Sequence, residues 1–400
     1  MASYKANKLL MVCARIPFPI VDGGAHAIYT MIQALYNEGL DLHVATYSSS
    51  KHEQNIEGIN RYACTSVLPK MNNPYGASDF LKSVLHQKPA SILSRFDESL
   101  FKKIVKPFAG IEFDTIIYAG LQTCAHLPFL KSSYPNARHI LYQVNIEHLL
   151  YHRIANGERN LIKRLAYKAQ ARLMKKFEFD ALKAVDQVIF ISPKDQRFFI
   201  GELGKLHSTA LLPPSLTVPK KPIKAPNTNT ICAYADWRWA PNAQGLAWFF
   251  RTIWPQIKKA VPTTEMNIAG KHLNSELLAI VNQLEGVHYL GFVDDLTAFI
   301  NSSDLLVAPL PSGSGIKIKL VEAMAHSLAF VTTEIGFEGF NSPGIEEQCV
   351  AKNEPDFADK CIALLTDSNR NNALRNTIYD YASTHLDPAN YSESLKDFIS

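Results

Sequence analysis

The sequence is poor in cysteine and has no long apolar run. None of its six cysteines stands in a C-x-x-C pair, so they predict reduced thiols in a core rather than a zinc site or a disulfide framework. No stretch approaches the roughly 18 apolar residues that a membrane-spanning helix requires. Arg15 and Pro17 interrupt the first apolar run too early for a secretory signal. These absences predict a soluble, cytoplasmic protein.

The sequence also lacks the motifs of two common enzyme classes. No G-x-G-x-x-G fingerprint follows the first apolar run, and no acidic residue follows at a distance of roughly 20, which argues against a dinucleotide-dependent dehydrogenase. No D-x-D motif follows an expected strand, and the adjacent pair Asp294 and Asp295 suits the N-cap of a helix instead. We therefore expect neither a metal site nor a bound cofactor.

Charge is divided unequally between the two halves of the chain. The formal net charge is +4, but residues 1–220 carry +10 and residues 221–400 carry −6. A basic half favours an anionic neighbour, such as a membrane surface, a lipid-linked acceptor or nucleic acid. Charge alone does not distinguish among them.

Short apolar runs recur between longer helical patterns along the whole chain. Because these runs are nearly continuous, they predict strands buried on both faces, and the helices between them predict parallel crossovers. The runs occupy residues 9–15, 42–48, 115–120, 139–144 and 187–192, then 230–235, 265–270, 287–292, 304–310 and 328–333. We expect an α/β protein with two Rossmann-like domains.

A proline-rich segment separates the two halves. Residues 213–230 contain five prolines and little apolar sequence, which predicts a linker. We expect an N-terminal domain over residues 1–215 and a C-terminal domain over residues 228–384. A last helix over residues 385–400 is expected to return to the N-terminal domain.

Residues 157–183 form a basic amphipathic pattern. Apolar residues recur at every fourth position, and lysines and arginines occupy much of the remaining surface. The ordinary interpretation is a helix packed on the core with a solvated outer face. The alternative is contact with an anionic membrane or acceptor.

The clearest chemical signal lies in residues 304–327, which predict a buried strand, a small-residue turn and a helix. In a parallel sheet this turn lies at the carboxyl edge, where ligands bind. The serines and glycines of residues 312–315 would let helix-opening N–H groups approach a diphosphate. Lys317 and Lys319 would add positive charge within the first helical turn, where an anion must offset it. Glu322 could accept hydrogen bonds from vicinal hydroxyls such as those of a ribose, or could simply pair with Lys319.

The segment GSGIKIKLVEAMA, which begins at Gly313, resembles the nucleotide-sugar motif of glycosyltransferase family 4, whose members are retaining enzymes of the GT-B fold. Further stretches agree with that family in order and spacing, at residues 15–28, 142–155, 184–195, 236–257, 268–271 and 291–296. The resemblance implies two Rossmann-like domains facing each other across a cleft, with the acceptor side in the first and the donor side in the second.

The resemblance also implies the substrates. The donor would be a nucleoside-diphosphate sugar, of UDP or GDP type, and the acceptor a glycan or lipid-linked hydroxyl in cell-envelope or exopolysaccharide synthesis. Nucleic acid has no part in this chemistry. Peripheral contact with an anionic inner membrane face through the basic half would suit such an acceptor.

Donor binding falls on a set of matched positions. They are Gly23, Gly24, Phe292, Val293, Ser314, Gly315, Ile316 and Glu322. Glu322 corresponds to the family's ribose-binding glutamate, and Phe292 and Val293 fall where the main chain reads the nucleobase. Ser314 departs from the family, because a glutamate usually stands at that position.

Catalysis by such a fold rests on stabilising the charge that grows on the departing diphosphate. We expect Lys319 first in this role, with Lys317 and Arg238. Asn145 and Glu147 follow a first-domain strand, and they could orient the incoming hydroxyl or be a loop cap and a surface carboxylate.

Two further departures leave other functions open. Many members place an arginine and a lysine where residues 236–245 read DWRWAPNAQG, and one branch has a histidine where Val144 stands. A protein that binds a nucleotide-sugar without turnover therefore remains an alternative. A GT-B sugar epimerase or phosphorylase also shares this architecture.

Overall fold

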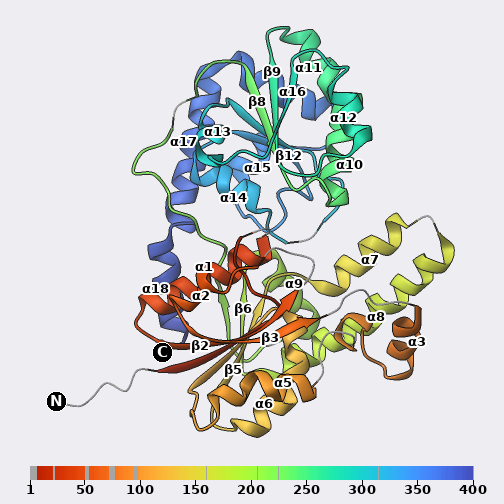
Figure 1. Cartoon of the computed structure of the whole chain (residues 1–400). Helices are drawn as coiled ribbons and strands as arrows, with labels where there is room; N and C mark the ends of the chain where they lie inside the picture. The colour runs from red at the N-terminus through yellow and green to blue at the C-terminus, as the bar shows by residue number, and fades with distance from the viewer. Residues whose placement is uncertain are drawn as a thin grey trace. The chain divides into compact units, whose positions relative to one another are not determined.

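The computed structural model describes residues 7–20, 23–49, 54–71, 77–93, 98–158, 160–204, 206–223, 225–313 and 315–399 (Figure 1). The chain divides into two compact units. The first comprises Met1–Pro214 with Tyr391–Ser400, and the second comprises Ser215–Asn390. The division falls within the proline-rich segment.

The first unit is built on a seven-stranded parallel sheet with the order β3-β2-β1-β4-β5-β6-β7. Its strands are β1 Lys8–Cys13, β2 Asp41–Ser49, β3 Cys64–Met71, β4 Thr115–Ala119, β5 Arg138–Gln143, β6 Gln187–Phe190 and β7 Thr209–Leu211. Every residue of the central strand β4 is buried, as expected for a strand covered on both faces.

Helices cover both faces of this sheet (Figure 1). They are α1 Gly23–Asn37, α2 Glu57–Asn60, α3 Ala77–Leu85, α4 Ala90–Leu93, α5 Glu98–Val105, η1 Lys106–Phe108, η2 Leu121–His126, α6 Leu127–Ser133, α7 Glu147–Gly157, α8 Leu161–Ala184 and α9 Pro193–Leu203. Alternate strand residues point to opposite faces, so Leu10 and Val12 of β1 join one core with α5, α6, α8 and α9. The intervening residues of β1 face the other side.

The last helix, α18 (Pro388–Ile399), belongs to the first unit from Tyr391 onward. Tyr391, Leu395 and Ile399 are buried. The Arg138 guanidinium donates a hydrogen bond to the carbonyl oxygen of Ile399.

The second unit is built on a six-stranded parallel sheet with the order β10-β9-β8-β11-β12-β13. Its strands are β8 Thr230–Tyr234, β9 Glu265–Ala269, β10 Val287–Gly291, β11 Leu305–Ala308, β12 Phe330–Thr333 and β13 Val350–Ala351. Its helices are α10 Ala240–Trp248, the π-helix η3 Phe249–Ile253, α11 Trp254–Ala260, α12 Ser275–Val281, α13 Leu296–Asn301, α14 Ile318–Ala325, α15 Pro343–Cys349, α16 Glu354–Thr366 and α17 Ser368–His385.

The predicted α/β class and all ten predicted strands are confirmed. The pattern missed β3, β7 and β13, which lie at the edges of the two sheets. β3 mixes polar and apolar residues and contains Pro69, and β7 and β13 have three and two residues. Edge strands are buried less and pair on one side only, so they carry little of the apolar signal that marks a central strand.

The cysteines are confirmed as free thiols, and five of the six are buried. Burial raises the pKa of the Cys13, Cys232 and Cys349 thiols to about 12. Cys64 corrects the prediction of core thiols, because it is exposed at the start of edge strand β3.

Within the described residues, no helix combines the length and the apolar character needed to cross a membrane.

Candidate functional site

The strand order reverses between β8 and β11 in the second unit. β8 pairs with β9 on one side and β11 on the other, so the chain winds outward in both directions from this point. In open parallel sheets, ligands bind beyond the carboxyl ends of the strands where the order reverses. The loop of residues 235–239 after β8 and the described part of the loop after β11, residues 309–313 and 315–317, meet at this place.

Gly245 lets α10 lie directly against the second of these loops. A Cβ atom at Gly245 would stand 1.7 Å from the carbonyl oxygen of Pro309. Such a distance is impossible, so the helix and the loop can approach this closely only without a side chain. Gly245 thereby fixes α10 beside the end of β11.

Replacing Gly245 with alanine should lower the free energy of unfolding by about 2 to 4 kcal/mol, because α10 must move off the Pro309 carbonyl. Urea denaturation followed by tryptophan fluorescence would measure the change. Gly344→Ala is the matched control, since a Cβ atom there meets nothing within 4 Å. A Gly245 variant as stable as the control would show that this contact imposes no constraint.

Lys319 lies in the first turn of α14, facing the loop after β8. Its ammonium donates a hydrogen bond to Oδ1 of Asn242 at 2.9 Å. Among the described residues, no second acceptor holds its other N–H groups. Burial lowers the pKa of Lys319 to about 8, with the Glu322 carboxylate opposing and Lys317 reinforcing that shift. Two N–H donors of a partly desolvated cation are thus available to an anion.

Asn242 connects the loop after β8 to α14. Its amide nitrogen donates to the carbonyl oxygen of Asp236 at 3.1 Å, while its oxygen accepts from Lys319. Asn242 was not among the residues predicted from the sequence, although residues 236–257 agree with the family in order and spacing. Its position in the first turn of α10, the helix after β8, was the signal that could have identified it.

Glu322 contacts Tyr234 rather than Lys319. The Tyr234 hydroxyl lies 2.8 Å from Oε2 of Glu322 and 3.1 Å from the carbonyl oxygen of Lys319, and it donates to both. Burial raises the pKa of Glu322, and the Tyr234 hydrogen bond and Lys319 oppose that rise. The other carboxylate oxygen makes no hydrogen bond to a described residue, so it can accept one from a ligand.

Lys317 requires a correction. The helix was expected to include it in the first turn, but α14 begins at Ile318 and Lys317 is its N-cap residue. Its side chain is 6% exposed, and its ammonium donates to the carbonyl oxygen of Gly315 at 2.5 Å. The Lys317 side chain therefore folds back onto the turn that precedes α14.

The turn itself depends on glycine. Gly313 and Gly315 have φ angles of 141° and 69°, in the region that side chains disfavour. Gly315 and Ile316 are both buried beside the start of α14. Ser314 lies outside the described residues.

Arg238 lies on the surface beside Asp236. Its Nε and a terminal nitrogen donate to the Asp236 carboxylate at 3.1 Å and 2.6 Å. This hydrogen bonding raises the pKa of Arg238 and lowers that of Asp236. The positive charge assigned to Arg238 is therefore compensated within its own loop.

Phe292 follows β10 at the same edge of the sheet. Its ring is 60% exposed, and the Lys271 ammonium lies 4.4 Å from the ring centroid. Val293 is partly buried next to it. Asp295 caps α13 by accepting from the backbone nitrogen of Ala298 at 2.8 Å, as predicted.

A small cavity of about 10 Å³ lies beneath this edge of the sheet. Tyr234, Asn242 and Lys319 contribute to its lining, together with residues at the ends of β8 and β11. It has room for about one water molecule. A larger ligand must therefore bind above it, where the Lys319 and Glu322 side chains are partly exposed.

Comparison with known proteins finds similarity over the second unit and over the whole chain. Residues 229–367 match the family model of "Glycosyl transferases group 1". An uncharacterized 44.6 kDa protein in the cps region of Klebsiella pneumoniae is 25% identical, covering 89% of this chain and 90% of its own. Solved structures resemble the whole chain.

Two of these structures show the extent of the likeness. Sucrose-phosphate synthase of Thermosynechococcus elongatus is 12% identical with a TM-score of 0.69, covering 98% of each chain. TarM of S. aureus, solved with UDP, is 9% identical with a TM-score of 0.66, covering 98% of this chain and all of its own. The fold is GT-B.

In the first unit of this GT-B chain, Asn145 and Glu147 follow β5, as predicted. The carbonyl oxygen of Asn145 accepts from the Gln143 amide at 2.6 Å, and Glu147 is the first residue of α7. Both side chains are partly buried. Gly23 and Gly24 open α1 after β1 and are also partly buried.

Glu178, which supports this loop, was not predicted from the sequence. The carboxylate is fully buried and accepts from the Gln143 amide at 2.6 Å, from the backbone nitrogen of Glu147 at 3.0 Å and from Nδ1 of His148 at 2.5 Å. Negative charge is favourable at a helix N-terminus, so Glu178 fixes the start of α7. Glu178 could have been predicted from its spacing, because it lies one turn after Met174 on the buried face of α8.

Proposed function

We propose that this chain is a retaining glycosyltransferase of family 4 that moves a sugar from a nucleoside-diphosphate sugar to a hydroxyl acceptor. The observation that carries the proposal is the grouping of Lys319 and Glu322 on the first two turns of α14, at the point where the strand order reverses. Two N–H donors of Lys319 and one oxygen of Glu322 are left for a ligand there. This pair suits the diphosphate and the ribose of one nucleotide.

The first step in this reaction is recognition of the donor. Lys319 and the amide groups that open α14 would bind the diphosphate, because positive charge and a helix N-terminus both favour phosphate. Glu322 would accept from a ribose hydroxyl, with Tyr234 holding the carboxylate in place. The exposed ring of Phe292 offers a flat surface for the nucleobase.

The second step is departure of the diphosphate. Negative charge grows on the bridging oxygen as the bond to the anomeric carbon breaks, and a fixed cation stabilises that charge more than it stabilises the bound donor. We propose Lys319 for this role. Asn145 and Glu147 would orient the acceptor hydroxyl, and a glycan or lipid-linked acceptor of the cell envelope fits the cps-region relative.

Mixing the purified protein with UDP- and GDP-sugars tests the proposal. Release of nucleoside diphosphate, followed by coupled absorbance and mass spectrometry, would support a transferase, and NMR of the product anomer would test retention. Binding without release would favour a non-catalytic nucleotide-sugar protein. A changed sugar still attached to its nucleotide would indicate an epimerase, and dependence on free phosphate would indicate a phosphorylase.

Donor binding should weaken as pH rises through 8. Burial lowers the pKa of Lys319 to about 8, so the free protein loses this positive charge above that pH, whereas a bound diphosphate favours the charged form. The affinity for the nucleoside diphosphate should therefore be about tenfold lower at pH 9 than at pH 7. Isothermal titration at pH 7, 8 and 9 would measure this. Lys319→Met should remove the dependence, and a pH profile unchanged in that variant would assign the titration to another group.

A further inference from the structure

The most exposed apolar side chains of the described chain gather on two helices of the first unit. Of the large apolar residues that are exposed, the five with the highest exposed fractions lie on α8 or α3. They are Ile162 at 80%, Leu85 at 73%, Leu161 at 71%, Leu165 at 67% and Leu81 at 65%. Single exposed aliphatics are ordinary, but several together mark an interaction surface.

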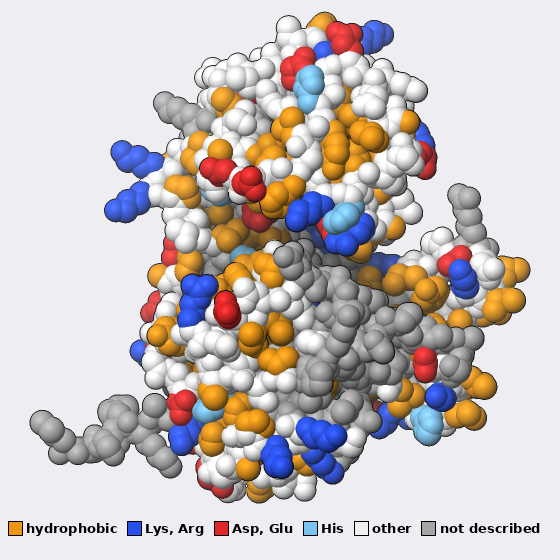
Figure 2. All heavy atoms as spheres, in the orientation of Figure 1, with side chains coloured by type: hydrophobic (Ala, Val, Ile, Leu, Met, Phe, Trp, Pro, Cys, Tyr) orange, Lys and Arg blue, Asp and Glu red, His pale blue; other side chains and the backbone are white. Residues whose placement is uncertain are grey.

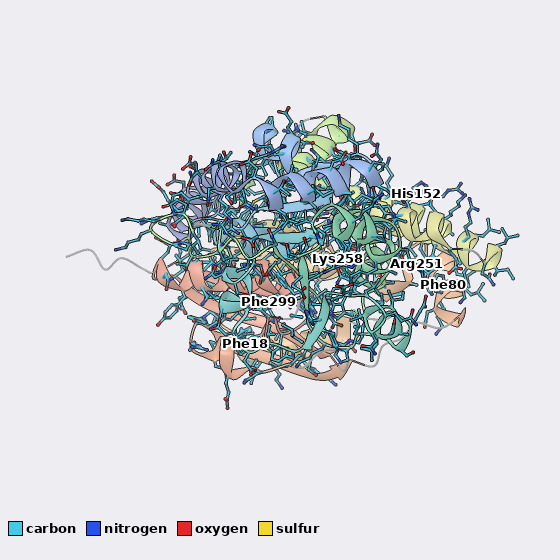
Figure 3. The ribbon with its side chains drawn as sticks, turned by 90° about the horizontal axis from the view of Figure 1, so that it is seen from above. Phe18, Phe80, His152, Arg251, Lys258 and Phe299 are labelled. Atoms are coloured by element: carbon cyan, nitrogen blue, oxygen red, sulfur yellow. The ribbon has the colours of Figure 1, made fainter. Side chains whose placement is uncertain are left out.

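These helices project from the rest of the first unit. Figure 1 shows α7 and the N-terminal half of α8 extending away from the seven-stranded sheet, with α3 beside α8. Seen from above, His152 of α7 and Phe80 of α3 lie on the same projecting part (Figure 3). Figure 2 shows apolar side chains at this edge, with cationic and a few acidic side chains among them.

A buried glutamine joins α3 to α8. The Gln170 amide donates to Oγ of Ser83 at 2.7 Å, and its oxygen accepts from the backbone nitrogen of Ala90 at 2.8 Å. The rings of Phe80 and Tyr167 add an edge-to-face contact at 6.4 Å. The exposed aliphatics of both helices therefore belong to one supported structure.

Positive charge surrounds the apolar side chains. Residues 161–174 contain Lys163, Arg164, Lys168 and Arg172 and no carboxylate. Within the described part of the chain, none of these four forms an ion pair. We call Leu161, Ile162, Lys163, Arg164 and Leu165, all exposed in the first turns of α8, the α8 tip.

We propose that the α8 tip, assisted by α3, docks on the surface of an anionic lipid bilayer. Exposed aliphatics can enter the interface between headgroups and acyl chains, while the long side chains of Lys163 and Arg164 reach lipid phosphates. A second copy of the chain fits less well, because it would bring the same cations together. The N-terminal half of α8 projects away from the sheet, which leaves the tip accessible to a membrane surface (Figure 1).

The expected strength of membrane binding depends on both the aliphatic and the cationic side chains of the tip. A few aliphatics alone give weak and reversible binding, and each cation close to an anionic surface raises the binding about fivefold. Binding should thus need both the apolar residues and the anionic lipid. Removing two cations should weaken it roughly thirtyfold.

Cosedimentation of the full chain with vesicles tests the proposal without any sugar substrate. The wild type should bind vesicles of phosphatidylcholine mixed with phosphatidylglycerol and should not bind phosphatidylcholine alone. K163Q/R164Q should bind the mixed vesicles roughly thirtyfold more weakly. L161S/I162S should weaken binding at least tenfold, because two aliphatics leave the interface.

Control variants separate this surface from general charge and folding. K220Q/K221Q removes two exposed lysines of the second unit and should bind as the wild type does. Because all substituted residues are exposed, circular dichroism and thermal melts should be unchanged. Failure of the wild type to bind mixed vesicles would overturn the proposal, as would equal binding to both vesicle types. A concentration-dependent dimer that L161S/I162S abolishes, without vesicle binding, would assign the tip to a second copy instead.

Discussion

Replacing Lys319 with methionine should lower donor turnover at least a hundredfold, because a well-placed cation at the departing group contributes about 3 to 4 kcal/mol. The nucleotide should still bind, more weakly, through Glu322 and the helix N-terminus. Initial rates of nucleoside diphosphate release, set beside titration with the nucleotide, would separate the two effects. If the substitution changes only KM, Lys319 contributes to ground-state binding of the donor and not to the chemical step.

The same substitution should not destabilise the protein at pH 7. The folded-state pKa of Lys319 is about 8, below the unfolded value. The desolvated ammonium therefore lowers the free energy of unfolding at every pH below 8. This cost disappears only as pH rises past the unfolded pKa. Methionine removes it, and thermal melts at pH 7 should show an equal or higher Tm. Lys259→Met, at an exposed position on α11, is the control for loss of one charge.

Glu322→Ala should weaken donor binding at least tenfold, because a charge-assisted hydrogen bond contributes about 1.5 to 3 kcal/mol. Titration with the nucleoside diphosphate, and with the corresponding inorganic pyrophosphate, would measure the effect. The loss should appear with the nucleotide and should be absent with pyrophosphate, which has no ribose.

Tyr234→Phe is the matched variant for this test. It removes the hydrogen bond to Glu322 but keeps the carboxylate, so its donor affinity should stay within a fewfold of the wild type. If Glu322 only holds Tyr234 in place, the two variants should weaken binding equally. That result would end the assignment of Glu322 to the ribose.

The sequence predicted the central strands and the edge of the sheet where the candidate site lies, because both follow from local apolar pattern. β8 and β11 are nearly continuous apolar runs, and each is followed by a polar or small-residue loop. Because the strands are parallel, both loops lie at the same edge of the sheet. Lys319 and Glu322 were predicted from their position after a small-residue turn together with the resemblance to glycosyltransferase family 4.

Partnerships between distant residues could not be predicted in this way. Tyr234 on β8 and Asn242 on α10 reach Glu322 and Lys319 on α14, across more than 70 positions of sequence. Lys317 was expected to add positive charge within the first helical turn, whereas its ammonium donates to the carbonyl oxygen of Gly315 in the turn before the helix. A residue's type shows what it can bond, and only the fold shows which partner reaches it first.

The continuous helix α8 joins two features of the first unit. Leu161 begins the helix and Glu178, seventeen positions later, supports the loop that carries Asn145 and Glu147. At 1.5 Å per residue, they are about 25 Å apart along the helix axis. If the first end of α8 binds lipid, the length of the rigid helix sets the distance between that loop and the bilayer surface. Lengthening the helix by whole turns would then increase this distance in steps.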